Sequence, residues 1–440
     1  MILISNIILF NLFIIFFFYR IGDFFGFFKL TILKSIIFGY SIFLVLTYYF
    51  YFLFKIDVSK IVTIWLVILF ILFIFFLKKF FKLKKKILPN NLIILFILII
   101  SILYFLPVYI YGEQFYVFRG NHWDLFNYLS IGSLFNNYDF SILSEIDKFP
   151  QEYKHFKNIE QIIFYRPLTS LLIAIYINIF DLDIFLIPYL FKVSLILLSA
   201  ISFKNLIDNL EISKINKIIT SLTFTFSFGL IYIFEIEAIS HLASIPIFLT
   251  IISEIYKFEK FEKFDAKYIL YFVILNCGLF LIYPELFCIS SIICGIYIFE
   301  KFFSSNQKKN FLKSLSLVLL IFILLTLPSY KTNYMFLLNQ LNASLYSNKD
   351  WWGYFGSFIL GKDNLVQNQS YVLQIKDYFL NHNLFQTLKY IIILHFENGY
   401  HFFYLNLIPS FFGLYFISLG KISFFLDWVN LLLLMIISIY

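Results

Sequence analysis

Long apolar runs constrain the fold of this chain more than any other feature of its sequence. An α-helix needs about 20 apolar residues to cross the hydrocarbon core of a bilayer. Hydrophobic residues make up 61% of the 440 residues and charged residues only 14%, a composition that excludes a soluble globular domain. The sequence therefore predicts an all-α polytopic membrane protein with about 12 transmembrane helices. The predicted spans lie near residues 2–19, 35–54, 61–77, 91–111, 184–203, 217–234, 239–257, 267–283, 285–302, 313–328, 403–419 and 423–440.

The connection between the third and fourth spans sets the orientation of the helices. It contains the segment Lys78–Lys86, with six lysines in nine residues, and cytoplasmic loops carry an excess of Lys and Arg. The span near 91–111 therefore runs outward, and the segment that follows it is external. Lysine-rich loops also account for the net charge of +8, so we expect no nucleic-acid partner. The first segment, Met1–Arg20, has neither a basic start nor a small-residue cleavage site, which favours a retained helix over a signal peptide.

The apolar run Pro167–Phe180 is short for a transmembrane span. If it crossed the membrane, the lysine-rich connections after it would be external; if it does not cross, they are all cytoplasmic. We therefore predict an external interfacial or re-entrant half-helix, with a full span as the alternative. The connections concerned contain Lys204, Lys214 and Lys217, then Lys257, Lys260, Lys263 and Lys267, then Lys301, Lys308, Lys309 and Lys313.

The spans and long polar segments divide the chain into consecutive parts. Residues 1–90 are predicted to form N-terminal transmembrane helices, and residues 91–330 a membrane core with a long first external loop at 112–180. A second external segment covers 331–402, and C-terminal transmembrane helices cover 403–440. All three cysteines fall inside predicted spans, so the sequence implies neither a disulfide framework nor a zinc site.

Asp124 is the most informative polar residue of the first external loop. It lies among Trp123, Leu125, Phe126 and Tyr128. A carboxyl group in apolar surroundings has a raised pKa unless it is paired, and a general base or a metal ligand often shows this property. The alternative is a structural aspartate.

Other ionisable residues are predicted at the same external side, from separate segments. Glu235 and Glu237 are two positions apart, so at most one of them faces a given site on a helix; either is also compatible with a solvated turn. Glu285 follows a proline, which suits the N-terminus of a helix as well as a site. A lysine inside a membrane helix, such as Lys192, is usually paired or functional. Arg119, His122, Arg166 and His241 complete the set of candidates.

These residues resemble the pattern of the GT-C superfamily of polyprenyl-phosphate-sugar glycosyltransferases, which includes protein O-mannosyltransferases and aminoarabinose transferases. In that superfamily a helix leads into a long external loop with a catalytic Asp near its start, and Asp124 in GNHWDLFNYL matches it. The segment Pro167–Phe180 is similar to a conserved Pro-Pro-Leu segment, and Lys192 lies where many members carry a basic residue. Glu235 or Glu237 lies where many carry a second acidic residue.

The resemblance covers about residues 90–330 and implies an inverting sugar transfer at the external face. Asp124 would take the proton of the acceptor hydroxyl as it attacks C1 of the sugar, and His122 would assist. Arg119, Arg166 and Lys192 would hold the phosphate of a polyprenyl-phosphate-linked sugar. Glu235, Glu237, His241 and Glu285 would bind the acceptor, which is a glycan, a lipid or a protein, or supply the second acidic group.

The resemblance also bears on cofactor and location. Asp124, His122, Glu235 and Glu237 are suitable ligand types for a divalent metal, Mg²⁺ or Mn²⁺, but no spacing demands one. The implied location is the bacterial inner (cytoplasmic) membrane, with the site on the periplasmic face. The pattern departs from the family in having a single Asp at the loop start and in lacking the second Pro and the Gly of the Pro-Pro-Leu segment.

Two other classes fit a polytopic chain with long external loops. An O-antigen ligase or polymerase relies on external Arg and His residues without an essential Asp base. A lipid-linked glycan transporter or flippase places ionisable groups near the membrane midplane, where this sequence has only Lys192. Replacement of Asp124 by Asn separates the first class from a GT-C transferase.

Overall fold

The computed structural model describes residues 2–24, 30–83, 91–111, 123–144, 167–180, 186–209, 213–225, 227, 230, 233–234, 238–255, 259–305, 307–330, 333 and 336–338. All regular structure in these residues is helical. The chain divides into two compact units. The first comprises residues 1–118, 122–209 and 238–340, and the second comprises residues 119–121, 210–237 and 341–440.

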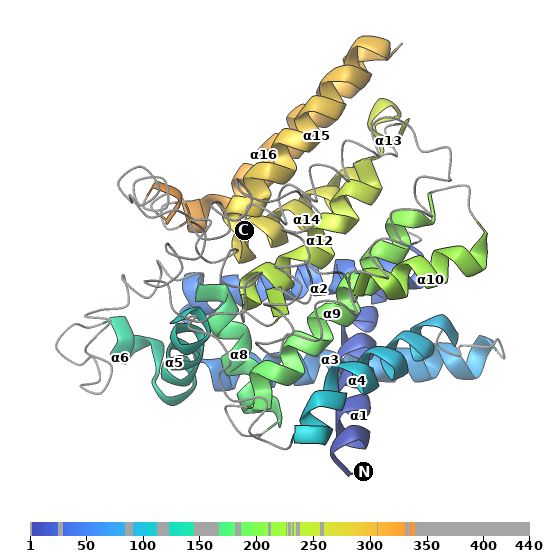
Figure 1. The fold of residues 1–440 in the computed structure, drawn as a ribbon. Helices are drawn as coiled ribbons and strands as arrows, with labels where there is room; N and C mark the ends of the chain where they lie inside the picture. The colour runs from blue at the N-terminus through green and yellow to red at the C-terminus, as the bar shows by residue number, and fades with distance from the viewer. Residues whose placement is uncertain are drawn as a thin grey trace, which may run out of the picture. The chain divides into compact units, whose positions relative to one another are not determined.

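The helices of the first unit follow the apolar runs of the sequence (Figure 1). The described helices of this unit that follow predicted spans begin and end within a few residues of the expected positions, because each span is bounded by polar or lysine-containing segments. They are α1 (Ile2–Phe24), α2 (Ile32–Tyr48) with the π-helical turn Tyr49–Leu53, α3 (Val58–Leu83), α4 (Asn91–Tyr111), α9 (Leu186–Ile207), α12 (Ile239–Ile255), α14 (Ala266–Ile282), α15 (Pro284–Ser304) and α16 (Lys308–Thr326).

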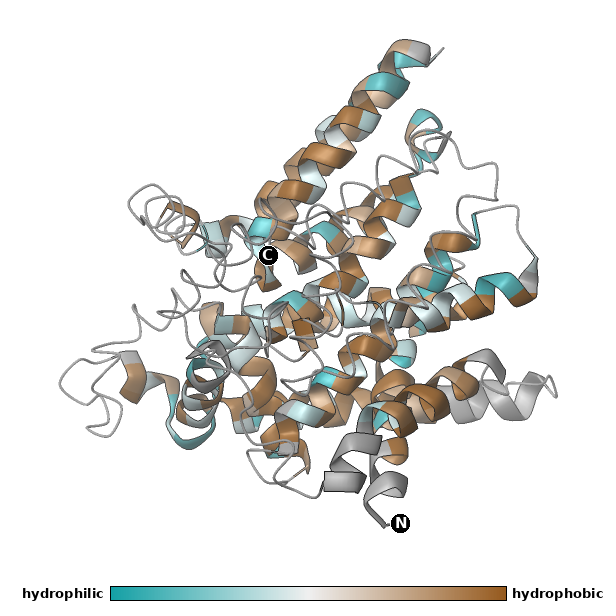
Figure 2. Ribbon diagram, viewed as in Figure 1, coloured by the Kyte–Doolittle hydropathy of each residue, from teal (hydrophilic) through white to brown (hydrophobic). Residues whose placement is uncertain are grey.

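Among the described residues, five helical segments are long and apolar enough to cross a membrane: Ile32–Leu53, Val58–Phe75, Tyr189–Ile207, Pro284–Phe303 and Lys308–Ser329. Shorter apolar helices accompany them at Ile93–Tyr104, Pro167–Phe180, Ile239–Ile255 and Ala266–Ile282. Figure 2 shows that hydrophobic residues make up much of the length of these helices. The chain is a helical membrane protein.

The α1–α2 hairpin is closed by two glycines. A Cβ atom on Gly22 would lie 1.9 Å from the backbone oxygen of Ser35, and one on Gly39 would lie 1.9 Å from the backbone oxygen of Phe18. Small residues allow the backbones of membrane helices to approach this closely. The ring of Phe18 then packs against that of Tyr40 in a tilted arrangement, with ring centroids 5.1 Å apart.

Contacts between α2, α12 and α14 fix the directions of these helices. Lys34 of α2 pairs with Glu254 near the end of α12, whereas Tyr40 of α2 donates a hydrogen bond to the carbonyl oxygen of Ala243 near the start of α12. The two helices are therefore antiparallel. Tyr268 at the start of α14 donates to the carbonyl oxygen of Glu254 at 2.5 Å, so α14 is antiparallel to α12 and parallel to α2.

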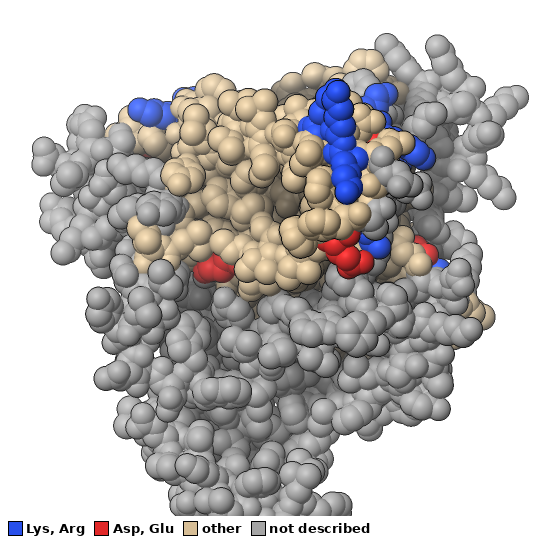
Figure 3. Space-filling view, turned by 90° about the horizontal axis from the view of Figure 1, so that it is seen from above, with Lys and Arg blue, Asp and Glu red and all other residues tan. Residues whose placement is uncertain are grey.

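Most of the described lysines of the helix connections lie at one end of this unit, which we call the lysine end, whereas Lys55 and Lys60 near the α2–α3 connection lie at the other end. Lys204 lies at the end of α9 and Lys260 in the short helix α13 (Glu259–Glu262), while Lys301 and Lys308 flank the α15–α16 connection. Ser314 of α16 donates to the carbonyl oxygen of Phe261, which ties that connection to α13. Seen from above, the described surface is mostly uncharged, and most charged side chains gather toward one side (Figure 3). The opposite end, which contains the α14–α15 turn at Tyr283, is called the turn end.

Helices α4 and α9 run in opposite directions, although α5, α6 and α8 lie between them in the sequence. Tyr189 of α9 donates to the carbonyl oxygen of Tyr104 in α4. Asn11 of α1 joins Ser101 of α4, at 3.0 Å, to Ser194 of α9, at 2.7 Å. Residue numbers rise along α4 as they fall along α9 through these contacts, so the helices are antiparallel.

The run Pro167–Phe180 forms helix α8 with the bounds expected from the sequence. Its first ten residues, Pro167–Tyr176, are all buried. It packs beside α5 (Trp123–Asn137), as Figure 1 shows, and Gly132 lets the backbones approach at Ser170. Tyr176 contacts Phe10 of α1 and Phe191 of α9, so α8 is enclosed by other helices of the unit.

The structure adds helices where the sequence predicted only a loop. Within 112–166 it has α5 and the short helix α6 (Phe140–Ser144), and the apolar residues Tyr128, Leu129 and Phe135 of α5 are buried. In the second unit, the predicted span near 217–234 is represented by α10 (Lys214–Thr225). Most of residues 226–237 and of the two last predicted parts, 331–402 and 403–440, lie outside the described residues.

Candidate functional site

Helix α5 meets the start of α12 at the turn end through a buried pair of hydroxyl groups. Tyr128 Oη lies 2.9 Å from Ser240 Oγ, and both residues are buried. Asp124 lies in α5, one turn before Tyr128; its side chain is outside the described part of the structure. The contact places the beginning of α5 next to the first turn of α12.

His241 and Tyr283 form a close polar contact at the turn end. Tyr283 Oη lies 2.5 Å from His241 Nε2, and the ring centroids are 4.3 Å apart. Tyr283 ends α14, and Pro284 begins α15 directly after it. The side chain of Tyr283 is only 2% exposed. The pair joins the first turn of α12 to the turn between α14 and α15.

Glu285 lies in the first turn of α15, two residues after Tyr283. A carboxylate in this position interacts favourably with the positive end of the helix dipole. The residue is half-buried. Its position therefore agrees both with a helix-stabilising role and with a group at the edge of a site.

Contacts between α9 and α12 relate the position of Lys192 in α9 to that of Ser240 in α12. These helices are parallel neighbours: Thr250 donates to Ser202 at 3.3 Å, and Ser253 donates to the carbonyl oxygen of Asn205 at 3.2 Å. Both contacts have an offset of 48 residues. Lys192 lies ten residues before Ser202 and Ser240 ten residues before Thr250, about 15 Å of helix in each case, and Pro246 lies within that part of α12.

The environment of Lys192 is buried and aromatic. The residue is 4% exposed, and its ammonium group lies 5.5 Å from the centroid of the Tyr189 ring. An aromatic face attracts a desolvated cation. A buried ammonium group at this level supplies a positive charge to the turn end of the bundle.

The structure thus gathers, at the turn end, Lys192, His241 and Glu285 of the candidates named from the sequence. It adds Tyr128, Ser240 and Tyr283, which the sequence did not single out, because Tyr and Ser are too common here for residue type to mark a site. An imidazole, a carboxyl group, a lysine and several hydroxyls can bind and orient a polyhydroxyl or phosphate-bearing ligand. Arg119, His122, Arg166, Glu235 and Glu237 lie outside the described residues.

A metal site is not assembled by the described residues. No group of three or more His, Cys, Asp or Glu side chains among them could hold an ion. The ligand types named from the sequence, at 122, 124, 235 and 237, all have side chains outside the described part.

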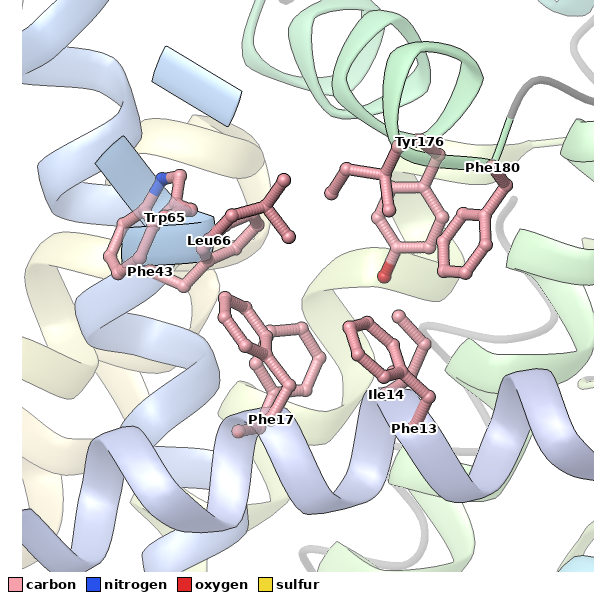
Figure 4. Close-up of a pocket in the computed structure, with 10 residues that line it drawn as sticks. Phe13, Ile14, Phe17, Phe43, Trp65, Leu66, Tyr176 and Phe180 are labelled. Carbon is pink, nitrogen blue, oxygen red and sulfur yellow. The ribbon is translucent and has the colours of Figure 1, made fainter. Parts of the chain in front are cut away.

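An apolar pocket lies next to this region, between α1, α2, α3 and α8 (Figure 4). Figure 4 shows the rings of Phe13, Phe17 and Phe180 around it, with the hydroxyl of Tyr176 directed into the gap between the α1 side chains. The remaining lining residues are Ile14, Phe18, Phe43, Trp65, Leu66 and Ile179. Such a lining suits hydrocarbon and offers no acid–base chemistry.

Asp57 fastens α6 to the α2–α3 connection. Its carboxylate accepts a hydrogen bond from the backbone N–H of Phe140 at 3.1 Å and pairs with Lys60 at 2.8 Å. The hydrogen bond from Lys60 lowers the pKa of Asp57 below its ordinary value of 3.8. Desolvation acts in the opposite direction, and the hydrogen bond from the Phe140 N–H lowers the pKa further. Because the folded pKa is depressed, this contribution to stability is present above the unfolded pKa and is lost as the pH falls below about 4.

We expect Asp57→Ala to release α6 without unfolding the bundle. The amide hydrogen of Phe140 should exchange about five to thirty times faster at pH 7, since one charge-assisted hydrogen bond of roughly 1–2 kcal/mol is lost. Hydrogen exchange with mass spectrometry measures this effect. Ser59→Ala, a change at the neighbouring exposed position, should leave the exchange rate as in the wild type. Equal rates in all three proteins would show that Asp57 does not hold α6.

No family model, characterised protein or solved structure matches the chain.

Proposed function

We propose that this protein is a membrane glycosyltransferase of GT-C type. It transfers a sugar from a polyprenyl-phosphate-linked donor to an acceptor hydroxyl, with inversion at the anomeric carbon. The observation that carries the proposal is the convergence at the turn end: α5 with Asp124, the level of Lys192, and the His241–Tyr283 pair come from separate helices.

The proposed architecture has about 12 spans and one half-helix. Helix α8 is too short to cross a bilayer of ordinary thickness and is enclosed by other helices. The opposite directions of α4 and α9 support an even number of crossings between them, which agrees with α8 as a half-helix. The lysine end then faces the cytoplasm, and the turn end faces the outside, in a bacterial inner membrane.

In the proposed chemistry the acidic residues and the histidines act on the acceptor, and the basic residues bind the donor phosphate. Asp124 is the general base that removes the proton from the acceptor hydroxyl, and His122 assists it. Lys192 attracts the donor phosphate as a point charge, and Arg119 and Arg166 bind its oxygens in bidentate fashion. Glu235, Glu237, His241 and Glu285 bind the hydroxyls of the acceptor.

The proposed donor carries an apolar polyprenyl chain, so an apolar surface next to the site must accommodate that chain. The apolar pocket of Figure 4 borders α8 and α3, and α3 belongs to a membrane-crossing segment with a mostly exposed surface. In the proposal the first isoprene units lie against the exposed apolar surface of α3 while the phosphate stays at the turn end.

Asp124→Asn should abolish transfer, with a loss of at least about 100-fold, because general-base catalysis contributes roughly 10²–10⁴-fold. The test is a mass-spectrometric profile of surface glycans from host cells lacking the gene, complemented with wild type or with the variant. Asp139→Asn, at an exposed carboxylate between α5 and α6, is the matched control and should restore the wild-type profile.

The outcomes separate the proposal from its rivals. One sugar missing in the null cells, restored by wild type and Asp139→Asn but not by a well-expressed Asp124→Asn protein, supports a transferase with Asp124 as base. Restoration by Asp124→Asn as well would contradict that role and favour an O-antigen ligase or polymerase, or a lipid-linked glycan flippase.

A further inference from the structure

A residue with an unusual backbone conformation follows the short helix α13. Phe264 has a φ angle of 51°, in the left-handed region that residues with a bulky side chain rarely adopt. Its N–H donates to the carbonyl oxygen of Phe261 at 3.2 Å, and the N–H of Asp265 donates to the carbonyl oxygen of Lys260 at 3.1 Å. These two hydrogen bonds form a Schellman motif, in which glycine is the usual residue at the position of Phe264.

The backbone around Phe264 is held firmly by its neighbours. Asp265 accepts a hydrogen bond from the N–H of Tyr268 at 3.1 Å and so caps the start of α14. Phe261 is buried, with its ring centroid 5.4 Å from that of Tyr268. Ser314 of α16 donates to the carbonyl oxygen of Phe261 at 2.6 Å. The left-handed conformation of Phe264 is therefore imposed by contacts on both sides of it.

The side chain of Phe264 does little for the fold. It is 41% exposed, and glycine would adopt the same φ angle without strain. An aromatic ring at this place thus costs stability, and its exposed surface is available for contact with something outside the bundle.

Exposed lysines accompany this ring. Helix α13 and the start of α16 both belong to the lysine end (Figure 1). Residues 259–267 and 308–313, which we call the basic corner, contain three acidic residues and six lysines, a net charge of +3. One of the acidic residues, Asp265, is engaged by Lys260 at 3.4 Å as well as by the cap of α14. The lysines, all exposed, are Lys260, Lys263, Lys267, Lys308, Lys309 and Lys313.

The basic corner lies where the helices of a membrane protein meet the lipid headgroups. Tyr268, at the start of α14, donates to the carbonyl oxygen of Glu254, near the end of α12, so the chain between these helices turns at the membrane surface. Lysines at this level attract anionic headgroups. Exposed phenyl rings beside lysines favour insertion at the boundary between headgroups and acyl chains.

We propose that the basic corner binds the headgroups of anionic phospholipids in the leaflet at the lysine end, with Phe264 inserted beneath them as an apolar anchor. Lys267 at the start of α14 and Lys313 near the start of α16 supply positive charge. The Schellman motif holds the backbone of the anchor in one conformation. This inference does not depend on glycosyl transfer, because it rests only on the helical membrane fold and on the residues of the corner.

The test is native mass spectrometry of the full-length protein in detergent micelles, titrated with phosphatidylglycerol or with phosphatidylcholine of the same acyl chains. We expect the wild type to bind phosphatidylglycerol more tightly. Lys267→Gln and Lys313→Gln should each weaken that binding about fivefold, the effect of one lysine near an anionic surface, and leave phosphatidylcholine binding unchanged. Phe264→Gly should weaken phosphatidylglycerol binding by a similar factor, because the apolar anchor is lost.

Stability supplies the second readout. Phe264→Gly should lower the unfolding equilibrium constant in lipid-free detergent about threefold or more, because the left-handed strain is relieved. Phe264→Leu keeps both the strain and an apolar side chain, so it should retain most of the lipid binding at wild-type stability. The matched control is Lys55→Gly, at a non-glycine residue with a φ angle of 54° near the opposite end, which should relieve strain without weakening phosphatidylglycerol binding.

The proposal predicts opposite changes for Phe264→Gly, with stability raised and lipid binding lowered. Equal binding of the two lipids by the wild type, or wild-type binding of phosphatidylglycerol by Phe264→Gly, would overturn it. An equal loss of phosphatidylglycerol binding in Lys55→Gly would overturn it as well, because attraction would then follow the total charge of the protein and not the basic corner.

Discussion

Gly39→Ala is expected to destabilise the protein strongly. The new methyl group would lie 1.9 Å from the backbone oxygen of Phe18, and a backbone atom has no alternative rotamer that could relieve the overlap. Helices α1 and α2 would have to separate by more than about 1 Å, which also disturbs the tilted ring contact between Phe18 and Tyr40. We expect a loss at the upper end of the range of about 1–3 kcal/mol seen for overpacked cores.

The measurement is the free energy of unfolding in mixed detergent micelles. Gly22→Ala should have a similar effect, because its Cβ would lie 1.9 Å from the backbone oxygen of Ser35. The double variant should lose less than the sum, since one separation of the helices relieves both overlaps.

Gly295 of α15 provides the control for these two glycines. No atom lies within 4 Å of a Cβ built at this position, and alanine has the higher helix propensity. Gly295→Ala should therefore be neutral or slightly stabilising. If Gly39→Ala were equally neutral, the close approach of α1 and α2 would be wrong.

Lys34→Met is expected to have the second large effect. Lys34 and Glu254 form an ion pair of 2.6 Å between α2 and α12, and their side chains are only 14% and 2% exposed. Removal of the lysine leaves the carboxyl group of Glu254 buried without its cation. Breaking a buried pair in this way costs about 3–5 kcal/mol.

The double variant Lys34→Met/Glu254→Leu tests the origin of this loss. Replacement of a whole buried pair by apolar residues is often close to neutral, so most of the stability should return. Lys260→Met removes one partner of the more exposed Lys260–Asp265 pair and should change the free energy of unfolding by only about 0–1 kcal/mol. Equal stabilities of Lys34→Met and wild type would show that the pair does not form in the folded protein.

Much of the helical framework was predictable because a membrane helix needs only length and apolar composition. The bounds of α4, α8, α14 and α15 agree with the apolar runs within a few residues. Most of the lysine-containing connections, such as those after α9 and α15, lie at one end of the first unit. Helix α5 was not predicted, because its apolar residues are interrupted by Asn and Ser and the segment was classified by its polar content.

The lateral packing of the helices depended on tertiary structure. Lipid and protein interior are both apolar, so the sequence of a span such as α2 does not mark which side contacts a neighbour. Nothing in the spacing indicates that Lys34 meets Glu254, or that Gly22 and Gly39 face opposing backbones.

The same distinction applies to the candidate site. The sequence by itself determined that this is a helical membrane protein and indicated Lys192, His241 and Glu285 as polar groups toward one end of it. Only the tertiary structure decided that His241 is bonded to Tyr283, that Ser240 meets Tyr128, and that α9 and α12 are parallel neighbours. These relations depend on helix rotation and register, and contacts between residues distant in the chain set both.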